Sequence, residues 1–237
     1  MTTTTATQGS FETAADYAAF RHLVLTRKSV RSFRPELLPE SRLRELLELA
    51  AWSPSNCNTQ PWQVHLASGA TLERVRVELA EHALAEGQSP EIPYNAEHYP
   101  PEMNERRGAH FADYQRAFGI EREDAEGRNR LLQMNLRFFD APHVLFLYLP
   151  AFANEREASD LGMFAQTFLL ALEAAGLGGL PQTSVGTYGA PIRRVLQPAE
   201  GHRLMFAIAF GYEDRSFSGA RLVQEREPID RFTVFHR

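Results

Sequence analysis

Two short stretches of the chain carry residues whose types and spacing suit ligand binding. The first, residues 27–34, contains four cations in eight residues, although the whole chain has a formal net charge of −5. Arg27, Ser29 and Arg31 alternate, so in an extended segment their side chains project to one side. Two guanidinium groups around a hydroxyl suit a phosphate or another oxyanion, because arginine donates bidentate hydrogen bonds to oxygen pairs. A solvated basic surface is the alternative interpretation.

The second stretch, residues 53–62, is rich in hydroxyl and amide side chains and ends in Trp62. Amides offer both donors and acceptors, which match the edge of a heterocycle with carbonyls and ring nitrogens. The alternative is a polar turn closed by Pro61, with Trp62 packed in the core.

A third stretch, residues 176–184, reads GLGGLPQTS and only superficially resembles a dinucleotide-binding fingerprint. Pro181 stands in place of the third glycine, and the stretch follows a helical pattern instead of joining a strand to a helix. Backbone amides at the end of a strand here can still meet a ligand.

Other chemistries find little support in the sequence. The eight histidines are scattered without metal-ligand spacing, so we expect no metal site, and neither a nucleophile elbow nor a phosphate-binding P-loop is present. The single cysteine, Cys57, excludes an internal disulfide framework and fits a reducing compartment. With no histidine nearby in sequence, Cys57 is expected to be an inert packed thiol.

Hydrophobic periodicity predicts the elements that must position these stretches. Helices are predicted at residues 16–26, 40–52, 72–84, 104–118, 121–139, 155–175 and 191–196. Strands are predicted at residues 63–67, 143–149, 177–181 and 202–210. The helix over 155–175 is apolar around most of its circumference, which predicts a place at the centre of a core or in a subunit interface. This order of elements predicts an α+β fold.

The rest of the chain sets further expectations. Residues 1–12 are predicted to be a disordered tail without a secretory pattern, and residues 13–237 a single domain. No apolar run reaches the roughly 20 residues that a membrane span needs, and a pI near 5.9 argues against nucleic acid as a partner. We therefore expect a cytoplasmic protein with no membrane or nucleic-acid partner. Residues 86–101 predict a long irregular loop, either a lid or a disordered segment.

Four motifs in order along the chain resemble the FMN-dependent nitroreductase family, most closely its nitrobenzoate-reductase-like branch. They are Arg27-x-Ser29-x-Arg31-x-Phe33, Ser53-Pro54-Ser55-x-x-Asn58-x-Gln60-Pro61-Trp62, Leu180-Pro181-Gln182 and Phe210-Gly211-Tyr212. The resemblance spans roughly residues 20–230. It implies a nitroreductase-like fold, with a central, mostly antiparallel sheet flanked by helices in an intertwined homodimer.

The resemblance also implies roles for individual residues. Those expected to hold FMN are Arg27, Lys28, Ser29, Arg31, Pro54, Ser55, Asn56, Asn58, Pro181, Gln182, Thr183, Arg221 and Arg226. The basic stretch would bind the phosphate and ribityl chain, with Arg31 at the pyrimidine edge and Arg221 or Arg226 completing the phosphate site. The loop at 54–58 would reach the flavin from the other subunit, and the backbone at 181–183 would pass along one flavin face.

The implied activity is an oxidoreductase in which NADH or NADPH reduces FMN and a small acceptor, a nitroaromatic or quinone, then takes the electrons by a ping-pong mechanism. No side chain need act as acid or base, and the sequence does not distinguish the two donors. Tyr94, Tyr99 and Phe138 are candidate stacking residues of the substrate pocket, with ordinary packing as the alternative. Other flavin chemistry on the same scaffold (enone reduction, dehalogenation, flavin fragmentation) or a non-catalytic flavin- or haem-binding module are the competing functions.

Overall fold

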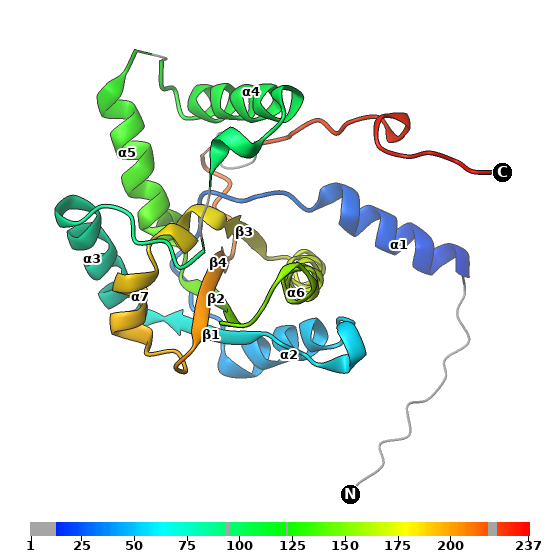
Figure 1. Ribbon diagram of the computed structural model, residues 1–237, viewed down its shortest axis with the longest axis horizontal. Coiled ribbons are helices and arrows are strands. Elements are labelled where there is room, and N and C mark those ends of the chain that lie inside the picture. Colours follow the sequence, from blue (N-terminus) through cyan, green and yellow to red (C-terminus); the bar gives the residue numbers. More distant parts are fainter. Residues whose placement is uncertain (1–12, 93–94, 122, 218–221) are drawn as a thin grey trace, which may run out of the picture.

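The computed structural model describes residues 13–92, 95–121, 123–217 and 222–237 (Figure 1). A four-stranded sheet lies at its centre, in the order β1-β2-β4-β3. The strands are β1 (Gln63–Ser68), β2 (His143–Pro150), β3 (Gly178–Gln182) and β4 (His202–Gly211), and each neighbouring pair is antiparallel. The predicted α+β fold with an antiparallel sheet is thus confirmed. The predicted tail at 1–12 lies outside the described residues.

Helices surround the sheet at the places that the periodicity predicts. Within the described ranges they are α1 (Thr13–Thr26), α2 (Glu40–Ala51), α3 (Gly69–Ala85), α4 (Pro101–Ala117), α5 (Ala125–Leu136), α6 (Glu155–Ala174) and α7 (Gly189–Leu196). The largest difference concerns the helix predicted at 121–139. It begins later because the Asp124 side chain caps it by accepting from the Gly127 N–H. It ends earlier because Phe138, Phe139 and Asp140 have φ values of 51–58°, in the left-handed region.

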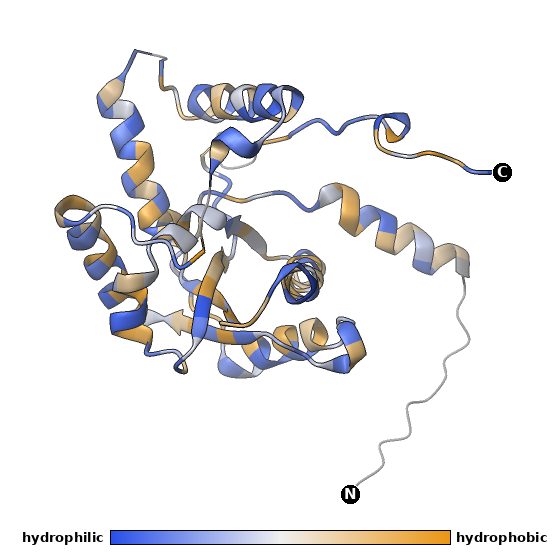
Figure 2. Cartoon of the chain, in the orientation of Figure 1, coloured by the Kyte–Doolittle hydropathy of each residue, from blue (hydrophilic) through white to orange (hydrophobic). Residues whose placement is uncertain are grey.

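The alternating side chains of β2 divide the core into two layers. Val144, Phe146 and Tyr148 point toward α3, α5 and the 138–140 turn, and all three are buried. Leu145 and Leu147 point toward α2 and α6 on the opposite face. Figure 2 shows the resulting hydrophobic colouring on the strands and on the helix faces beside them. Burial on both faces explains why this strand is a continuous apolar run.

Helix α6 lies against the sheet, as its apolar circumference predicts. Asn154 and Glu157 form a capping box at its N-terminus, and Gly176 follows its last turn with φ +72°, the left-handed conformation that commonly ends a helix. Leu161, Phe164 and Phe168 are among its buried residues.

Part of the 86–101 loop is fixed to the body of the protein. The Ser89 N–H donates to the Thr187 carbonyl (2.8 Å). The Glu91 carboxylate accepts from the Arg193 side chain (2.8 Å) and from the Leu204 N–H (2.6 Å). Residues 89–91 are therefore attached to α7 and β4, and the chain then leads into α4.

Helix α1 and the C-terminal segment extend from the body on the same side of the molecule (Figure 1). Both expose large apolar side chains, among them Tyr17, Phe20, Phe232 and Phe235. No helix in the described part of the chain is long and apolar enough to cross a membrane.

Candidate functional site

The basic stretch lies in an extended segment between β3 and the chain that follows β4. The Val30 N–H donates to the Gly179 carbonyl (3.2 Å), and the Arg34 N–H donates to the Tyr212 carbonyl (2.8 Å). Gly178 permits this close approach, since a Cβ at that position would lie 2.6 Å from the Val30 side chain. Gly178 and Gly179 belong to the stretch that does not match a dinucleotide-binding fingerprint. They bring this stretch, residues 176–184, into contact with the basic stretch, residues 27–34.

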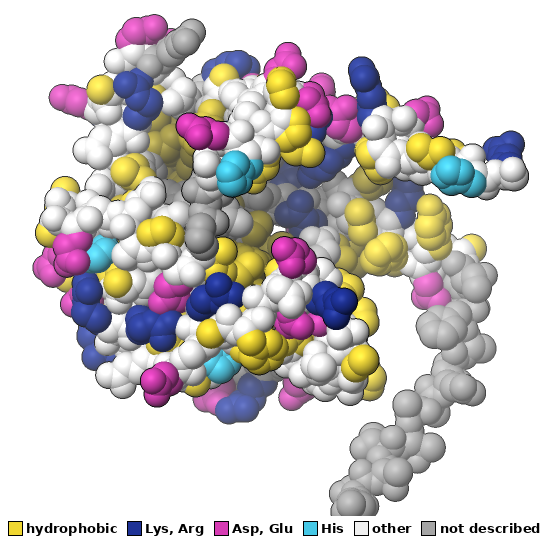
Figure 3. All heavy atoms as spheres, in the orientation of Figure 1, with side chains coloured by type: hydrophobic (Ala, Val, Ile, Leu, Met, Phe, Trp, Pro, Cys, Tyr) yellow, Lys and Arg dark blue, Asp and Glu magenta, His cyan; other side chains and the backbone are white. Residues whose placement is uncertain are grey.

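A cavity of about 240 Å³, here called the cationic cavity, opens beside this segment. The charged or polar side chains that line it are Arg27, Lys28, Ser29, Arg31, His110, Gln224 and Arg226. Among the described residues that line it there is no aspartate or glutamate. Figure 3 shows Lys and Arg side chains inside the recess beneath α4.

The cations of this cavity are short of counter-charges. Burial lowers the pKa of Arg27, the positive charge of Arg226 lowers it further, and Glu173 partly opposes both effects. Among the described residues, no ion pair involves Arg27, Lys28 or Arg31. Arginine stays protonated in proteins, so the cavity is a site of unneutralised positive charge suited to an anion.

A second cavity of about 390 Å³, here called the ring cavity, adjoins the first. Arg31 and His110 line both. Its walls come from α4, α5 and the end of β3, where Pro181, Gln182 and Thr183 are lining residues. Its surface is mainly apolar, as expected for a pocket that holds a planar ring.

The side chain of Gln182 serves the protein interior. Gln182 is only 3% exposed, and its Nε2 donates to the Asn135 carbonyl (2.9 Å). The neighbouring Ser184 hydroxyl donates to Asn135 Oδ1 (2.9 Å). The end of β3 is therefore tied to α5, and the backbone of residues 181–183 remains to contact a ligand.

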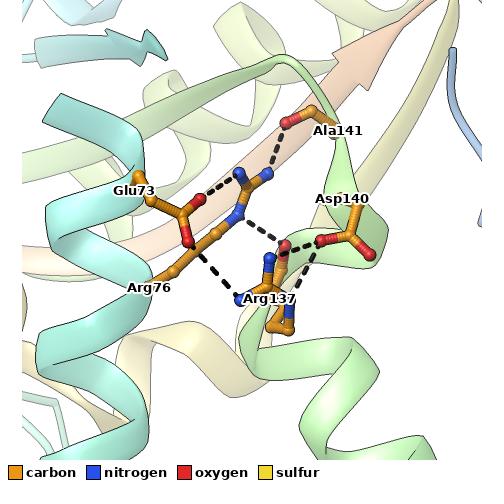
Figure 4. A network of polar contacts seen from close by, with 5 residues as sticks. All are labelled: Glu73, Arg76, Arg137, Asp140 and Ala141. Carbon is orange, nitrogen blue, oxygen red and sulfur yellow. Dashed lines mark hydrogen bonds and ion pairs between the residues drawn. The ribbon is translucent and has the colours of Figure 1, made fainter. Parts of the chain in front are cut away.

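The α5 end is held in turn by a polar network (Figure 4). Arg76 on α3 donates to the carbonyls of Arg137 (3.1 Å) and Ala141 (2.7 Å), while Glu73 pairs with Arg76 and Arg137. These bonds enclose the left-handed turn at 138–140. Arg76 thereby stabilises the backbone that presents Asn135 to the ring cavity.

The polar stretch at residues 53–62, here called the polar loop, lies outside both cavities. None of Pro54, Ser55, Asn56 and Asn58 lines either cavity, so one chain does not bring them together with the basic stretch. The loop is nevertheless anchored on α6.

Two contacts form that anchor. The Asn56 N–H donates to the Asp160 carboxylate (3.1 Å), which is almost fully buried, and the Ser53 hydroxyl donates to Thr167 Oγ1 (2.8 Å). Cys57 is exposed, so the prediction of a packed thiol is wrong: the left-handed backbone at 57–58 turns the loop outward.

The substrate-pocket assignments need correction. Phe138 is fully buried and packs edge-on against Phe146 (5.6 Å between ring centroids), so its predicted pocket role is wrong: its ring fills the core. Tyr99 lines neither cavity, and the Arg107 guanidinium lies 5.2 Å from its ring centroid. Tyr94 lies outside the described residues, as does Arg221.

Among the lining residues that sequence reasoning missed are His110, Tyr114 and Asn135. His110, Tyr114 and Phe118 are spaced by four along the predicted helix, so they share one face. This aromatic stripe was the sequence pattern that could have identified His110 and Tyr114 as site residues. Within the described ranges, no three His, Cys, Asp or Glu side chains are placed to hold a metal ion.

Comparison with known proteins gives the family. The model of the nitroreductase family matches residues 24–212. This chain belongs to the nitroreductase family. It is 36% identical over 221 residues to nitroreductase NfnB of Mycolicibacterium smegmatis (92% of this chain, 93% of the relative), and 30% identical over 222 residues to 4-nitrobenzoate reductase of Nocardioides sp. (92% and 90%).

Solved structures show the same relationship. The FMN-dependent nitroreductase NfnB from Mycobacterium smegmatis in complex with NADPH superimposes with a TM-score of 0.90 at 34% identity, covering 94% of this chain and all of that one. The FMN- and NADPH-dependent NfnB from sphigopyxis sp. strain HMH gives 0.88 at 28% identity, covering 92% and 99%. The fold is the nitroreductase fold.

Proposed function

We propose that this chain is an FMN-dependent oxidoreductase that takes electrons from NADH or NADPH and passes them to nitroaromatic or quinone acceptors in alternating half-reactions. One observation carries the proposal: a cationic cavity without carboxylates continues, through Arg31, into an apolar cavity along the end of β3. A phosphate joined to a large planar ring has this distribution of charge and shape. The relatives named above support the nitroaromatic class of acceptor.

The cationic cavity fits the phosphate end of FMN. Arg27, Lys28 and Arg226 supply positive charge and Ser29 a hydroxyl, and charge-assisted hydrogen bonds to phosphate are among the strong ones. Arg31 stands at the junction, where it would meet the pyrimidine edge of the ring. When bound, FMN supplies the hydride and electron chemistry itself.

The residues of this chain would bind the flavin, orient its ring and stabilise the charge that develops on it. The half-buried guanidinium of Arg31 would favour negative charge on the adjacent part of the ring, because preorganised positive groups stabilise charge that develops beside them. The backbone at 181–183 would define one face of the ring, because the amide nitrogen of the Gln182 side chain already donates to the Asn135 carbonyl. Leu131 and Leu132 of α5 give the cavity an apolar wall.

We further infer that the working protein is a homodimer in which the 54–58 loop completes the partner's site. Asp160 holds this loop in a defined shape, yet its side chains stay outside both cavities. Trp52, directly before it, is 87% exposed. Together with the apolar surfaces of α1 and the C-terminal segment, this exposure is what a subunit interface would cover.

The first test is a visible absorption spectrum of the protein purified without added cofactor, before and after anaerobic addition of NADH and then NADPH. We expect flavin bands that bleach with at least one donor, followed by reoxidation on adding a nitroaromatic. A colourless protein that gains no flavin on incubation with FMN would refute the proposal. Bound flavin that never bleaches would instead favour a flavin-binding module without turnover.

A further inference from the structure

Arg31 is one of two described residues, with His110, that line both cavities, and its surroundings are unusual for a cation. Burial lowers its pKa, and no carboxylate pairs with it among the described residues. Its contact with the Ser29 carbonyl is long, at 3.3 Å. A guanidinium on a flexible stem tends to keep its charged head in water, so another contact must keep this one inside.

That contact is the ring of Tyr114. The Arg31 guanidinium carbon lies 4.8 Å from the ring centroid, within the range of a cation–π interaction, which strengthens when the pair is desolvated. Tyr114 lines the ring cavity beside Arg31. Burial raises the pKa of its hydroxyl, and the nearby Arg31 charge partly opposes that rise. The pair is therefore partly removed from water at the junction of the two cavities.

The Tyr114 ring is itself held on other sides. His110, one turn earlier on α4, stacks parallel to it (6.1 Å, 4° between planes), and Phe118, one turn later, meets it edge-on (5.2 Å). Phe118 also contacts Phe139 (6.1 Å), a core residue of the left-handed turn. A continuous row of aromatic contacts thus fixes the ring relative to the core.

We propose that Tyr114 is a positioning residue: its ring holds the Arg31 guanidinium at the junction of the cavities, ready for the flavin. The inference rests on the proposed function, and it adds a residue on α4 that acts through Arg31. It makes the orientation of this cation depend on α4, a helix distant in sequence from the basic stretch.

The test compares FMN affinity and flavin potential in full-length variants stripped of flavin and reconstituted. Tyr114→Leu removes the ring face, and we expect FMN to bind roughly tenfold more weakly. Tyr114→Phe keeps the face but removes the hydroxyl, which also acts electrostatically on Arg31, so its loss of FMN affinity should be clearly smaller than that of Tyr114→Leu. If the held guanidinium favours reduced over oxidised flavin by a further factor of about ten, the Tyr114→Leu potential becomes about 30 mV more negative.

A double-mutant cycle separates positioning from a structural role. In an Arg31→Ala background, Tyr114→Leu should cause little further loss of FMN affinity, because the residue through which it acts is absent. Fully additive losses would overturn the proposal, as would wild-type affinity and potential in Tyr114→Leu. Should Tyr114→Leu fail to fold, fluorinated phenylalanines at position 114 preserve shape while weakening the ring face; a graded loss supports the proposal and a flat series overturns it.

The outcomes also separate this inference from the proposed function. Wild-type protein that binds no FMN refutes both. Wild-type protein that binds FMN, loses it in Arg31→Ala and keeps it in Tyr114→Leu refutes the positioning role alone.

Discussion

The basic segment at 27–34 and the polar loop at 53–62 differ in where they direct their chemistry. The first is wedged between β3 and the chain after β4, and its side chains line a cavity of the same chain. The second is anchored to α6 through Asp160, and its side chains line neither cavity. Residue types indicate what each stretch binds, whereas backbone anchors decide which surface it serves.

The two anchors also differ in chemistry. The chain that follows the basic segment is held at Leu38, whose N–H donates to Nε2 of His143. The polar loop is held by an almost fully buried carboxylate, Asp160, through the Asn56 N–H. Burial lowers the pKa of His143 to about 4, so the first anchor is sensitive to acid, whereas the second depends on a charge-assisted hydrogen bond.

Removing the cations of the basic segment should have the largest effect. In Arg27→Ala/Arg31→Ala we expect FMN affinity to fall at least about 100-fold, because each hydrogen bond to a charged group contributes roughly 1.5–3 kcal/mol. Fluorescence quenching of FMN on titration measures this loss. The matched control is Arg42→Ala/Arg44→Ala, which removes two exposed arginines from α2. Unchanged flavin occupancy in the first variant would contradict the phosphate assignment.

Acid should have the next largest effect, because it weakens the Leu38 anchor that follows the basic segment. His143 Nε2 accepts from Leu38 (2.8 Å) and its Nδ1 meets the Ser68 hydroxyl (2.5 Å), and burial lowers its pKa to about 4. Between pH 6.5 and 4 the unfolded chain binds a proton that the folded chain excludes. The free energy of unfolding should therefore fall by up to about 3 kcal/mol as pH drops through this window, and the contribution is complete above 6.5.

Urea unfolding at pH 7 and pH 4.5 measures this dependence. His143→Gln should be less stable at pH 7 and should lose that part of the pH dependence. His22→Gln, at an exposed position on α1, should keep it. Equal pH dependence in wild type and His143→Gln would show that the buried ring does not titrate as described.

Releasing the polar loop from its anchor should lower FMN affinity by a smaller factor, and the affected site should be that of the partner subunit. Asp160→Ala removes the acceptor of the Asn56 N–H, and we expect FMN affinity to fall roughly tenfold, the scale of one hydrogen bond to a charged group. Asp160→Asn keeps one acceptor oxygen and should lose less. Isothermal titration with FMN measures both.

Mixing variants tests the subunit boundary directly. If the loop serves the partner, co-expressed Arg27→Ala/Arg31→Ala and Asp160→Ala chains should regain intact sites in about a quarter of positions, since half the dimers are mixed and each carries one good site. Separately purified variants give the baseline. If co-expression restores no FMN sites, the loop would belong to the site of its own chain and not to that of the partner.

Features that depend on residues close together in the sequence could be predicted, and features that depend on contacts between distant parts of the chain could not. The strand at 143–149 was predictable because burial on both faces requires a continuous apolar run, and the basic segment because its charges are adjacent in sequence. The turn at 138–140 was not, because its left-handed backbone is imposed by Arg76 from another helix. Tyr114 was missed for the same reason: its contact with Arg31 joins residues far apart in the chain.

The smallest expected effect concerns the shape of the polar loop. Cys57 has φ +49°, a conformation that costs most residues roughly 1–2 kcal/mol and that asparagine adopts more readily. Cys57→Asn should therefore raise the free energy of unfolding by about 0.5 kcal/mol, whereas Cys57→Val should lower it by about 1 kcal/mol, because a β-branched residue is a poor fit at positive φ. Thermal unfolding at pH 7 measures both.

Turnover separates strain from thiol chemistry at the same position. Cys57→Asn lacks the thiol, yet it should keep wild-type turnover, because the loop contributes its backbone shape and its neighbouring amides. Loss of turnover in Cys57→Asn with a fully folded, flavin-bound protein would assign a chemical role to the thiol. Equal stability in the asparagine and valine variants would mean that the backbone at position 57 adjusts to either side chain. The positive φ would then not determine the stability of the loop.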